Sequence, residues 1–268
     1  MRKHVRDLEM LRGRLLDRLP FTFIRFSDGE MEILRGSKLV LGSQGVEWSK
    51  GKSSFIYPSF DHKHFDPEAD GDLRAQLLMA ASYQSDFFFK GVPALHNKAP
   101  EDKRRMVTLN GGTEINLTYA DLLINSNYRR FLSDVLPILR DRNDVLLVGN
   151  HASRPDLLNP NWGFLPVPDG VFQRHQSFVD HALAHIREGP ANRVILSSAS
   201  SISNILGHQL HLLDSSITFI DIGTALHEQL GLSGAKRAFQ SQLMPWSPKS
   251  AKDKLAYFIF GGHRFKWR

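Results

Sequence analysis

The sequence predicts an α/β fold, with a Rossmann-like, mostly parallel sheet flanked by helices, for three reasons. The second half alternates short apolar stretches of strand length with longer stretches of helical spacing, which is typical of βαβ units. The composition, 41% hydrophobic and 23% charged, is that of a globular protein with a substantial core. No repeat, low-complexity tract or Gly/Ser linker divides the 268 residues. We therefore expect a single domain over residues 1–268, with an N-terminal helix and a basic C-terminal tail.

The first half opens with apolar residues at helical spacing, which predict an amphipathic helix over residues 5–19. The aromatic and polar segment 46–67 has no clear period, and we interpret it as a long ordered loop. The other expected elements are strands over 21–26, 38–41 and 86–90, and helices over 29–35, 67–82, 119–123 and 128–139.

The second half supplies most of the predicted sheet. Its expected strands cover residues 144–148, 164–167, 193–196 and 217–220, and its expected helices cover 175–187, 202–213 and 224–230. Ligands of such sheets bind beyond the carboxyl ends of the strands. The turns that follow strands are therefore the first places to look for a site.

The composition excludes several kinds of site and indicates where the protein is located. The chain has no cysteine, which excludes disulfides, thiolate nucleophiles and Cys-ligated metals, so that any metal would need oxygen or histidine ligands. No apolar run approaches the roughly 20 residues that cross a bilayer, and the first residues are charged throughout. We expect a cytoplasmic protein without a transmembrane segment.

The net charge of +6 favours polyanionic partners such as nucleotides, nucleic acid or an anionic membrane. An ordinary solvated surface rich in Lys and Arg explains the same charge equally well. Charge alone therefore does not choose a partner.

The segment RFSDGE follows the first predicted strand and carries two acidic residues separated by one glycine. A tight turn at Gly29 could bring the carboxylates of Asp28 and Glu30 toward one point, where a hard cation such as Mg²⁺ or Mn²⁺ could sit. Arg25 could add a guanidinium to a phosphate. Ser27 and Glu30 also fit the S-x-x-E capping box of an ordinary helix, and spacing alone favours that interpretation.

RFSDGE resembles the R-F/Y-G-D-G-E segment of the GT-D glycosyltransferases, a family once labelled a domain of unknown function. The resemblance continues, in the same order along the chain, through YADLLINSNYRRF, DVLLVGN, FLPVPDGVF and VILSSASSISNILGHQL to FIDIG. It implies a GT-D type of Rossmann-like fold, a UDP-sugar donor, and a divalent metal held by Asp28 and Glu30. The chain departs from the family pattern at Ser27, at Thr224 and in the serine-rich turn 197–201.

Two further turns supply candidate donor contacts. Ser198, Ser200 and Ser201 lie between a predicted strand and a predicted helix, where hydroxyls and free N–H groups can bind a diphosphate. Asp221 ends the FIDIG strand, a usual position for a catalytic or ligand contact. Helix N-capping is the alternative role for both the serines and Asp221.

Four more residues are candidates for the sugar or acceptor side. Gln173, Arg174 and His175 join a predicted strand to a helix and could face the sugar or the acceptor. Glu228 could line the same cleft as Asp221. Surface or purely structural roles remain the alternatives for all four residues.

Two other functions compete with sugar transfer. Gly149-Asn150-His151 and the Gly262-His263 pair suggest a metallophosphoesterase, but the chain lacks the early D-x-H ligand pair that such an enzyme needs. Lys103-Arg104-Arg105 and the basic tail 263–268 suggest a nucleic-acid-binding module that is not an enzyme, although no recognised nucleic-acid motif is present. A saccharide, a glycoprotein or a hydroxylated base of DNA could each be the acceptor.

Overall fold

The computed structural model describes residues 3–42, 45–48, 51–53, 63–93, 99–189 and 193–232. Its centre is a seven-stranded sheet in the order β7-β6-β1-β11-β10-β8-β9, and every neighbouring pair is parallel. The strands are β1 Thr22–Arg25, β6 Phe88–Val92, β7 Leu117–Tyr119, β8 Val145–Asn150, β9 Gly163–Val167, β10 Val194–Ser197 and β11 Thr218–Asp221. The predicted α/β fold with a parallel sheet is confirmed.

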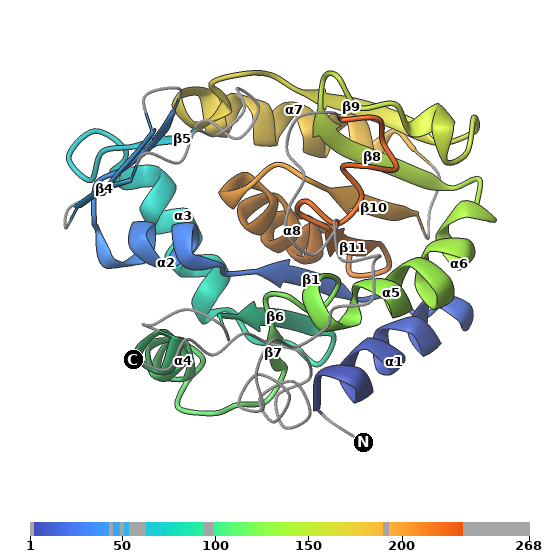
Figure 1. Cartoon of the computed structure of the whole chain (residues 1–268), viewed down its shortest axis with the longest axis horizontal. Coiled ribbons are helices and arrows are strands. Elements are labelled where there is room, and N and C mark those ends of the chain that lie inside the picture. Colours follow the sequence, from blue (N-terminus) through green and yellow to red (C-terminus); the bar gives the residue numbers. More distant parts are fainter. Residues whose placement is uncertain are drawn as a thin grey trace, which may run out of the picture.

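The central strands are buried on both faces, as in parallel sheets covered by helices. Phe23 and Ile24 follow each other on β1, and because side chains alternate along a strand they enter different cores. Ile24 belongs to the core under α2 Asp28–Arg35, α3 Gly71–Ser82, α4 Ala99–Leu109, α7 His175–Arg187 and α8 Ser201–Leu213. Phe23 belongs to the core under α1 Lys3–Leu16 and the helical segment α5 Tyr128–Arg130, η3 Phe131–Val135 and α6 Leu136–Arg140. Figure 1 shows these two layers on either side of the sheet.

Most of the predicted helices are confirmed, with ends that shift by a few residues. The helix expected over 128–139 contains one π-helical turn, η3. Three short 3₁₀ turns connect other elements: η2 Asn125–Asn127, η4 Pro155–Leu157 and η5 Val171–Arg174. In the described part of the chain, no helix is long and apolar enough to cross a membrane.

Helix α8 approaches the sheet closely at Gly207. A Cβ atom there would lie 2.7 Å from Cγ2 of Ile24 on β1 and 2.7 Å from the ring of Phe219 on β11. Only a residue without a side chain allows this distance. The close approach seats α8 over β1 and β11, with its first turn beside their carboxyl ends.

A second, antiparallel sheet corrects the prediction of a loop over 46–67. Its order is β4-β3-β2-β5, with β2 Leu39–Gly42, β3 Gly45–Trp48, β4 Gly51–Ser53 and β5 Lys63–Phe65. Strands of three or four residues are too short to show a period in the sequence. Residues 49, 50 and 54–62 of the predicted loop lie outside the described residues. The labelled strands β4 and β5 lie at the edge of the molecule, beyond α2 and α3 (Figure 1).

Two predicted helices are wrong. Where a helix was expected over 119–123, the chain forms the edge strand β7 and then turns. The segment 224–230 forms successive turns, bracketed by Gly223 and Gly231, which both have positive φ. Its apolar residues Ala225, Leu226 and Leu230 are buried, which explains the helical spacing. Successive turns can bury apolar residues at this spacing as well as a helix does. The sequence pattern therefore could not distinguish turns from a helix.

Candidate active site

The candidate site lies at the carboxyl ends of β1, β10 and β11, three strands that are adjacent in the sheet. Strand β1 lies between β6, the next strand of this sheet along the chain, and β11, the last one described. The order of the sheet therefore reverses at β1, and ligands of open α/β sheets bind at such a position. The first turns of α2 and α8 follow β1 and β10 at this edge.

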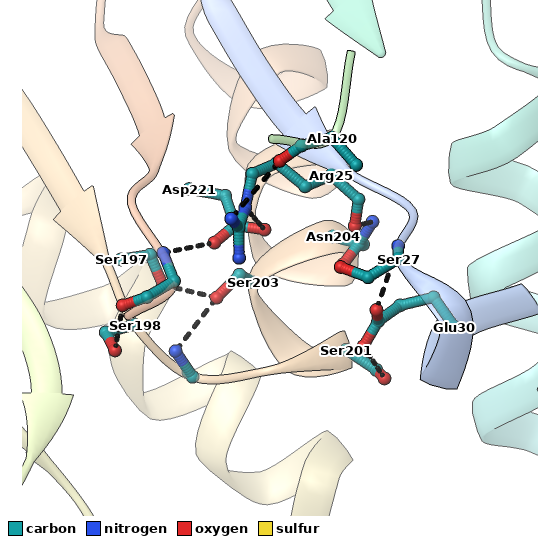
Figure 2. Close-up of polar contacts among 12 residues, drawn as sticks. Arg25, Ser27, Glu30, Ala120, Ser197, Ser198, Ser201, Ser203, Asn204 and Asp221 are labelled. Carbon is teal, nitrogen blue, oxygen red and sulfur yellow. Dashed lines mark hydrogen bonds and ion pairs between the residues drawn. The ribbon is translucent and has the colours of Figure 1, made fainter. Parts of the chain in front are cut away.

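Glu30 lies at the centre of this edge, in the first turn of α2, and is buried. Its Oε2 accepts a hydrogen bond of 3.1 Å from the backbone N–H of Ser27, and its Oε1 accepts one of 2.7 Å from the hydroxyl of Ser201 (Figure 2). The capping box, which the sequence offered as an alternative role for Ser27 and Glu30, is formed. Glu30 also joins α2 to α8.

Glu30 stays ionised despite its burial. Burial raises the pKa of this carboxyl, but the ammonium of Lys63, 3.5 Å from Oε1, lowers it, as do the bond from Ser201, a backbone hydrogen bond and the charge of Arg25. The net result is a pKa below the ordinary value of Glu. The site therefore holds a buried negative charge at neutral pH.

Asp28 differs from Glu30, because its side chain is exposed and, among the described residues, its Oδ1 accepts only a local hydrogen bond of 3.1 Å from the N–H of Gly29. Two carboxylates offer hard oxygen ligands of the kind that Mg²⁺ and Mn²⁺ prefer. The ammonium of Lys63 at Glu30 Oε1 shows that the position accepts a cation. Within the described ranges, no three His, Cys, Asp or Glu side chains gather in a way that could hold a metal ion. An ion here would need water or phosphate as further ligands.

Arg25 and Asp221, at the carboxyl ends of β1 and β11, form an ion pair with Nε 3.4 Å from Oδ2. The guanidinium of Arg25 also donates to the carbonyl oxygen of Ala120 at 3.3 Å, and Asp221 Oδ1 accepts from the N–H of Gly223 at 2.9 Å (Figure 2). A side chain at position 223 would collide with this guanidinium. These contacts hold Arg25 in place. Both carboxylate oxygens of Asp221 have partners within the protein.

The pKa of the Asp221 carboxyl is raised. Burial is the main cause, the negative charge of Glu30 adds to it, and Arg25 acts in the opposite direction. The predicted end-of-strand position of Asp221 is confirmed, and its catalytic role stays a prediction.

Ser200 is strained, with φ 55° and ψ −141°, a region that residues with a side chain rarely adopt. It is the N-cap residue of α8, and its buried hydroxyl has no hydrogen-bond partner among the described residues. Strain of this kind persists where the surrounding structure imposes it, and it is concentrated at functional sites.

The other serines of the turn are bonded within the protein. Ser198 Oγ donates to the carbonyl of Gly223 at 2.7 Å and lies 3.3 Å from Nε2 of His227. Ser203 Oγ lies 2.9 Å from Ser197 Oγ and accepts from the N–H of Ala199 at 2.9 Å (Figure 2). These bonds fix the turn between β10 and α8.

Three members of this cluster were not predicted: Lys63, His227 and Asn204, which donates to the carbonyl of Arg25 at 2.8 Å. Each enters the site through contacts between distant segments. No local pattern distinguishes them from surface or core residues of the same type.

The predicted acceptor-side residues lie apart from these contacts. Gln173 and Arg174 are exposed on η5, which follows β9, the edge strand of the sheet. His175 Nδ1 lies 3.1 Å from the carbonyl of Phe172, and Glu228 is exposed. No hydrogen bond joins the described side chains of these four residues to the cluster around Glu30. Their roles stay predictions.

The features behind the competing functions have ordinary structural explanations. Asn150 ends β8 and accepts the N–H of Ala152 at 2.8 Å, as in a local turn. Lys103 pairs with Glu114 at 2.8 Å, and Arg105 donates to the carbonyl of Leu34 at 2.9 Å. The Gly262-His263 pair of the phosphoesterase hypothesis and the basic tail 263–268 of the nucleic-acid hypothesis lie outside the described residues.

Three solved structures share this fold. One is a domain of unknown function 1792 (DUF1792), with 15% identity and a TM-score of 0.52 over 86% of this chain and 83% of that chain. The second is described as a new glycosyltransferase (DUF1792) from Streptococcus sanguinis, with 17% identity and a TM-score of 0.51 over 86% of each chain. The third is described as a DUF1792 domain with a distinct glycosyltransferase fold, with 14% identity and a TM-score of 0.51 over 97% of this chain and 90% of that chain.

No protein-family model matches the sequence, and no curated protein matches it. The fold of this chain is therefore that of the DUF1792 structures, as the resemblance implied. Because the identities are 14–17%, the likeness defines the fold, and the activity must be argued from the site.

Proposed function

We propose that this protein is a glycosyltransferase that transfers a sugar from a UDP-sugar to an acceptor hydroxyl, with Mn²⁺ or Mg²⁺ held by Asp28 and Glu30. One observation carries the proposal: Ser200, the N-cap residue of α8, is strained and its buried hydroxyl has no hydrogen-bond partner among the described residues, while the next residue, Ser201, is bonded to the ionised Glu30. The glycosyltransferase fold of the structural neighbours supports it.

The diphosphate of the donor fits the first turn of α8. Helix N-termini bind phosphate because their free N–H groups and the positive end of the helix dipole face the ligand. Ser200 can add its hydroxyl, and Ser198 and Ser201 lie in the same turn. The bond between Glu30 and Ser201 brings the first turn of α2 next to that of α8, so a second helix N-terminus lies at the proposed diphosphate site.

The reaction breaks the bond between the anomeric carbon and the diphosphate oxygen, and UDP leaves with the electron pair. The acceptor oxygen bonds to that carbon and loses its proton. A bound divalent ion would neutralise negative charge on the leaving diphosphate. The helix N-termini favour the same charge, and preorganised groups of this kind give the largest catalytic effects.

The acceptor can be a saccharide, a glycoprotein or a hydroxylated base of DNA, because each presents a suitable hydroxyl. Sugar transfer to DNA with hydroxymethylated bases, but not to unmodified DNA of the same sequence, would select the third class. Transfer to neither DNA would direct the search to oligosaccharides and proteins.

A panel of UDP-sugars tests the proposal without knowledge of the acceptor. Binding and slow hydrolysis are measured with Mn²⁺, with Mg²⁺ and with a chelator. At least one UDP-sugar should bind more tightly with an ion than with chelator. Absence of binding and hydrolysis for the whole panel under all three conditions would refute the proposal.

A further inference from the structure

Lys63 brings a positive charge to the first turn of α2 from the small antiparallel sheet. It is the first residue of β5, which pairs with β2 in the register Leu41 to Lys63. Its Nζ lies 3.5 Å from Oε1 of Glu30, and its side chain is 16% exposed, so the contact is largely shielded from water. A Cβ atom at Gly29 would also lie 3.5 Å from this Nζ. The ammonium therefore covers the turn that carries Asp28 and Glu30.

This position is unusual for a cation. The first turn of a helix carries the positive end of the dipole and normally attracts anions. The ionised carboxylate of Glu30, with Oε1 3.5 Å from Nζ, stabilises the ammonium of Lys63 at this position. Glu30 is thus already neutralised by a cation of the protein.

We propose that Lys63 is the resident counter-cation of Glu30, which a divalent ion must displace in order to bind there, and which then pairs with the phosphates of the donor. This inference rests on the proposed donor site. It adds to the site a residue from outside the main sheet.

Competition for Glu30 follows from its other bonds. Oε2 is bonded to the N–H of Ser27, and Oε1 receives the hydroxyl of Ser201 besides facing Lys63. The ammonium is the member of this set that can move without unfolding a helix turn, because it ends a flexible side chain. Once displaced, the ammonium stays near Glu30, because strand β5 holds the backbone of Lys63. A Lys ammonium is a good point-charge partner for phosphate.

The test removes this charge and measures the ion alone. Lys63→Met keeps the apolar stem and removes the ammonium, and Mn²⁺ affinity is measured by isothermal titration calorimetry. An opposite charge within about 4–6 Å changes the proton affinity of a carboxylate by one to three pKa units. We therefore expect Mn²⁺ to bind roughly tenfold or more tightly to Lys63→Met than to the wild type. With saturating Mn²⁺, UDP should bind more weakly to the variant than to the wild type.

Lys38→Met is the matched control, because Lys38 pairs with Asp66 at 3.6 Å, away from Glu30, and is 51% exposed. Lys38→Met should leave Mn²⁺ affinity unchanged, and Lys63→Arg, which keeps a cation, should stay near the wild type. Equal or weaker Mn²⁺ binding by Lys63→Met would overturn the inference. The proposed function is tested independently of Lys63, and it is refuted if UDP-sugars do not bind to the wild type. Gain of Mn²⁺ binding by the variant would support Lys63 even then.

A measurement on the wild-type protein covers the case in which Lys63→Met does not fold. Acetylation of lysines by a water-soluble ester is followed by mass spectrometry with and without saturating Mn²⁺. Lys63 should be acetylated faster with Mn²⁺, since its ammonium is released from Glu30, whereas Lys38 should not change. Equal or slower acetylation of Lys63 with Mn²⁺ would overturn the inference.

Discussion

The hydroxyl of Ser201 donates a hydrogen bond of 2.7 Å to Oε1 of Glu30, and this bond joins the first turn of α8 to the first turn of α2. Both residues are buried, so water does not replace the contact. One carboxylate thereby serves the positive ends of two helices. The two halves of the proposed donor site are aligned by this contact.

Replacement of Ser201 by alanine should lower the free energy of unfolding by about 1–3 kcal/mol, because a buried charged acceptor loses a partner. It should also weaken Mn²⁺-dependent binding of the UDP-sugar. Urea denaturation and calorimetry measure the two effects. Ser177→Ala is the control, since the exposed hydroxyl of Ser177 donates a local hydrogen bond to the carbonyl of Arg174. Equal stability of both variants would show that the bond contributes nothing.

Two substitutions of Ser200 separate strain from hydroxyl chemistry. Ser200→Gly should raise the free energy of unfolding by about 1 kcal/mol or more, because glycine adopts positive φ without a steric cost. Ser200→Ala keeps the strain and should not stabilise the protein. If the hydroxyl contacts the diphosphate, both variants should lose donor affinity to the same extent. Unchanged donor affinity in both would remove Ser200 from the site.

The two acidic residues of RFSDGE should respond differently to substitution. Asp28→Ala should abolish the stimulation of UDP-sugar binding by metal and leave stability nearly unchanged, because Asp28 is exposed. Glu30→Ala should lose metal stimulation and also about 1–3 kcal/mol of stability, since its capping and interhelix bonds disappear. Parallel thermal denaturation and donor titration measure both properties. Loss of stability without any change in donor binding would reduce Glu30 to a capping residue.

The sequence predicted the part of the site that is local. RFSDGE showed its capping box directly, and Ser197 to Ser201 and Asp221 followed apolar runs long enough to predict strands. Lys63 could not be predicted, because β5 has three residues and pairs with a strand more than twenty residues earlier. The sequence could not show how far Gln173 and Arg174 lie from the Glu30 cluster, because strand order cannot be read from a sequence. The fold puts β8 between β10 and their own strand β9.

Stability should fall in mild acid because of His208. Burial, followed by the charges of His211 and Lys90, lowers the pKa of His208 to about 4, while an unfolded histidine has a pKa of about 6.5. The unfolded chain therefore binds the proton first. The contribution of His208 is complete above about pH 6.5 and is lost as pH falls toward 4, at up to about 1.4 kcal/mol per unit.

Urea denaturation at several pH values between 7 and 4 measures this effect, with His208→Gln as the comparison. Other acidic and basic groups are present in both proteins, so the difference between the two curves reports His208 together with its interactions with His211 and Lys90. That difference should shrink as pH falls, since the variant has no group to titrate. Parallel curves would show that His208 titrates normally in the folded protein.

Duplex DNA should gain little from the basic residues of α4. Each phosphate that a protein neutralises adds about 0.9 to the slope of the logarithm of affinity against the logarithm of salt concentration. Lys103 and Arg105 are bonded to Glu114 and to the carbonyl of Leu34. Lys103→Ala and Arg105→Ala should therefore each change this slope by less than about 0.9, as measured by fluorescence anisotropy. A change of about 0.9 in the slope for each variant would support a nucleic-acid-binding surface on α4.

The pairing of β1 with β11, in the register Thr22 to Phe219, has a consequence for synthesis. A chain that leaves the ribosome from its N-terminus exposes β1 long before its neighbour exists, with only β6 and β7 to pair on one side. Contacts between residues so distant in sequence close slowly, because the entropy of a long loop is lost first. Glu30 and Arg25 meet Ser201 and Asp221 only in that last closure. The proposed donor site is therefore complete only after the central strands have paired.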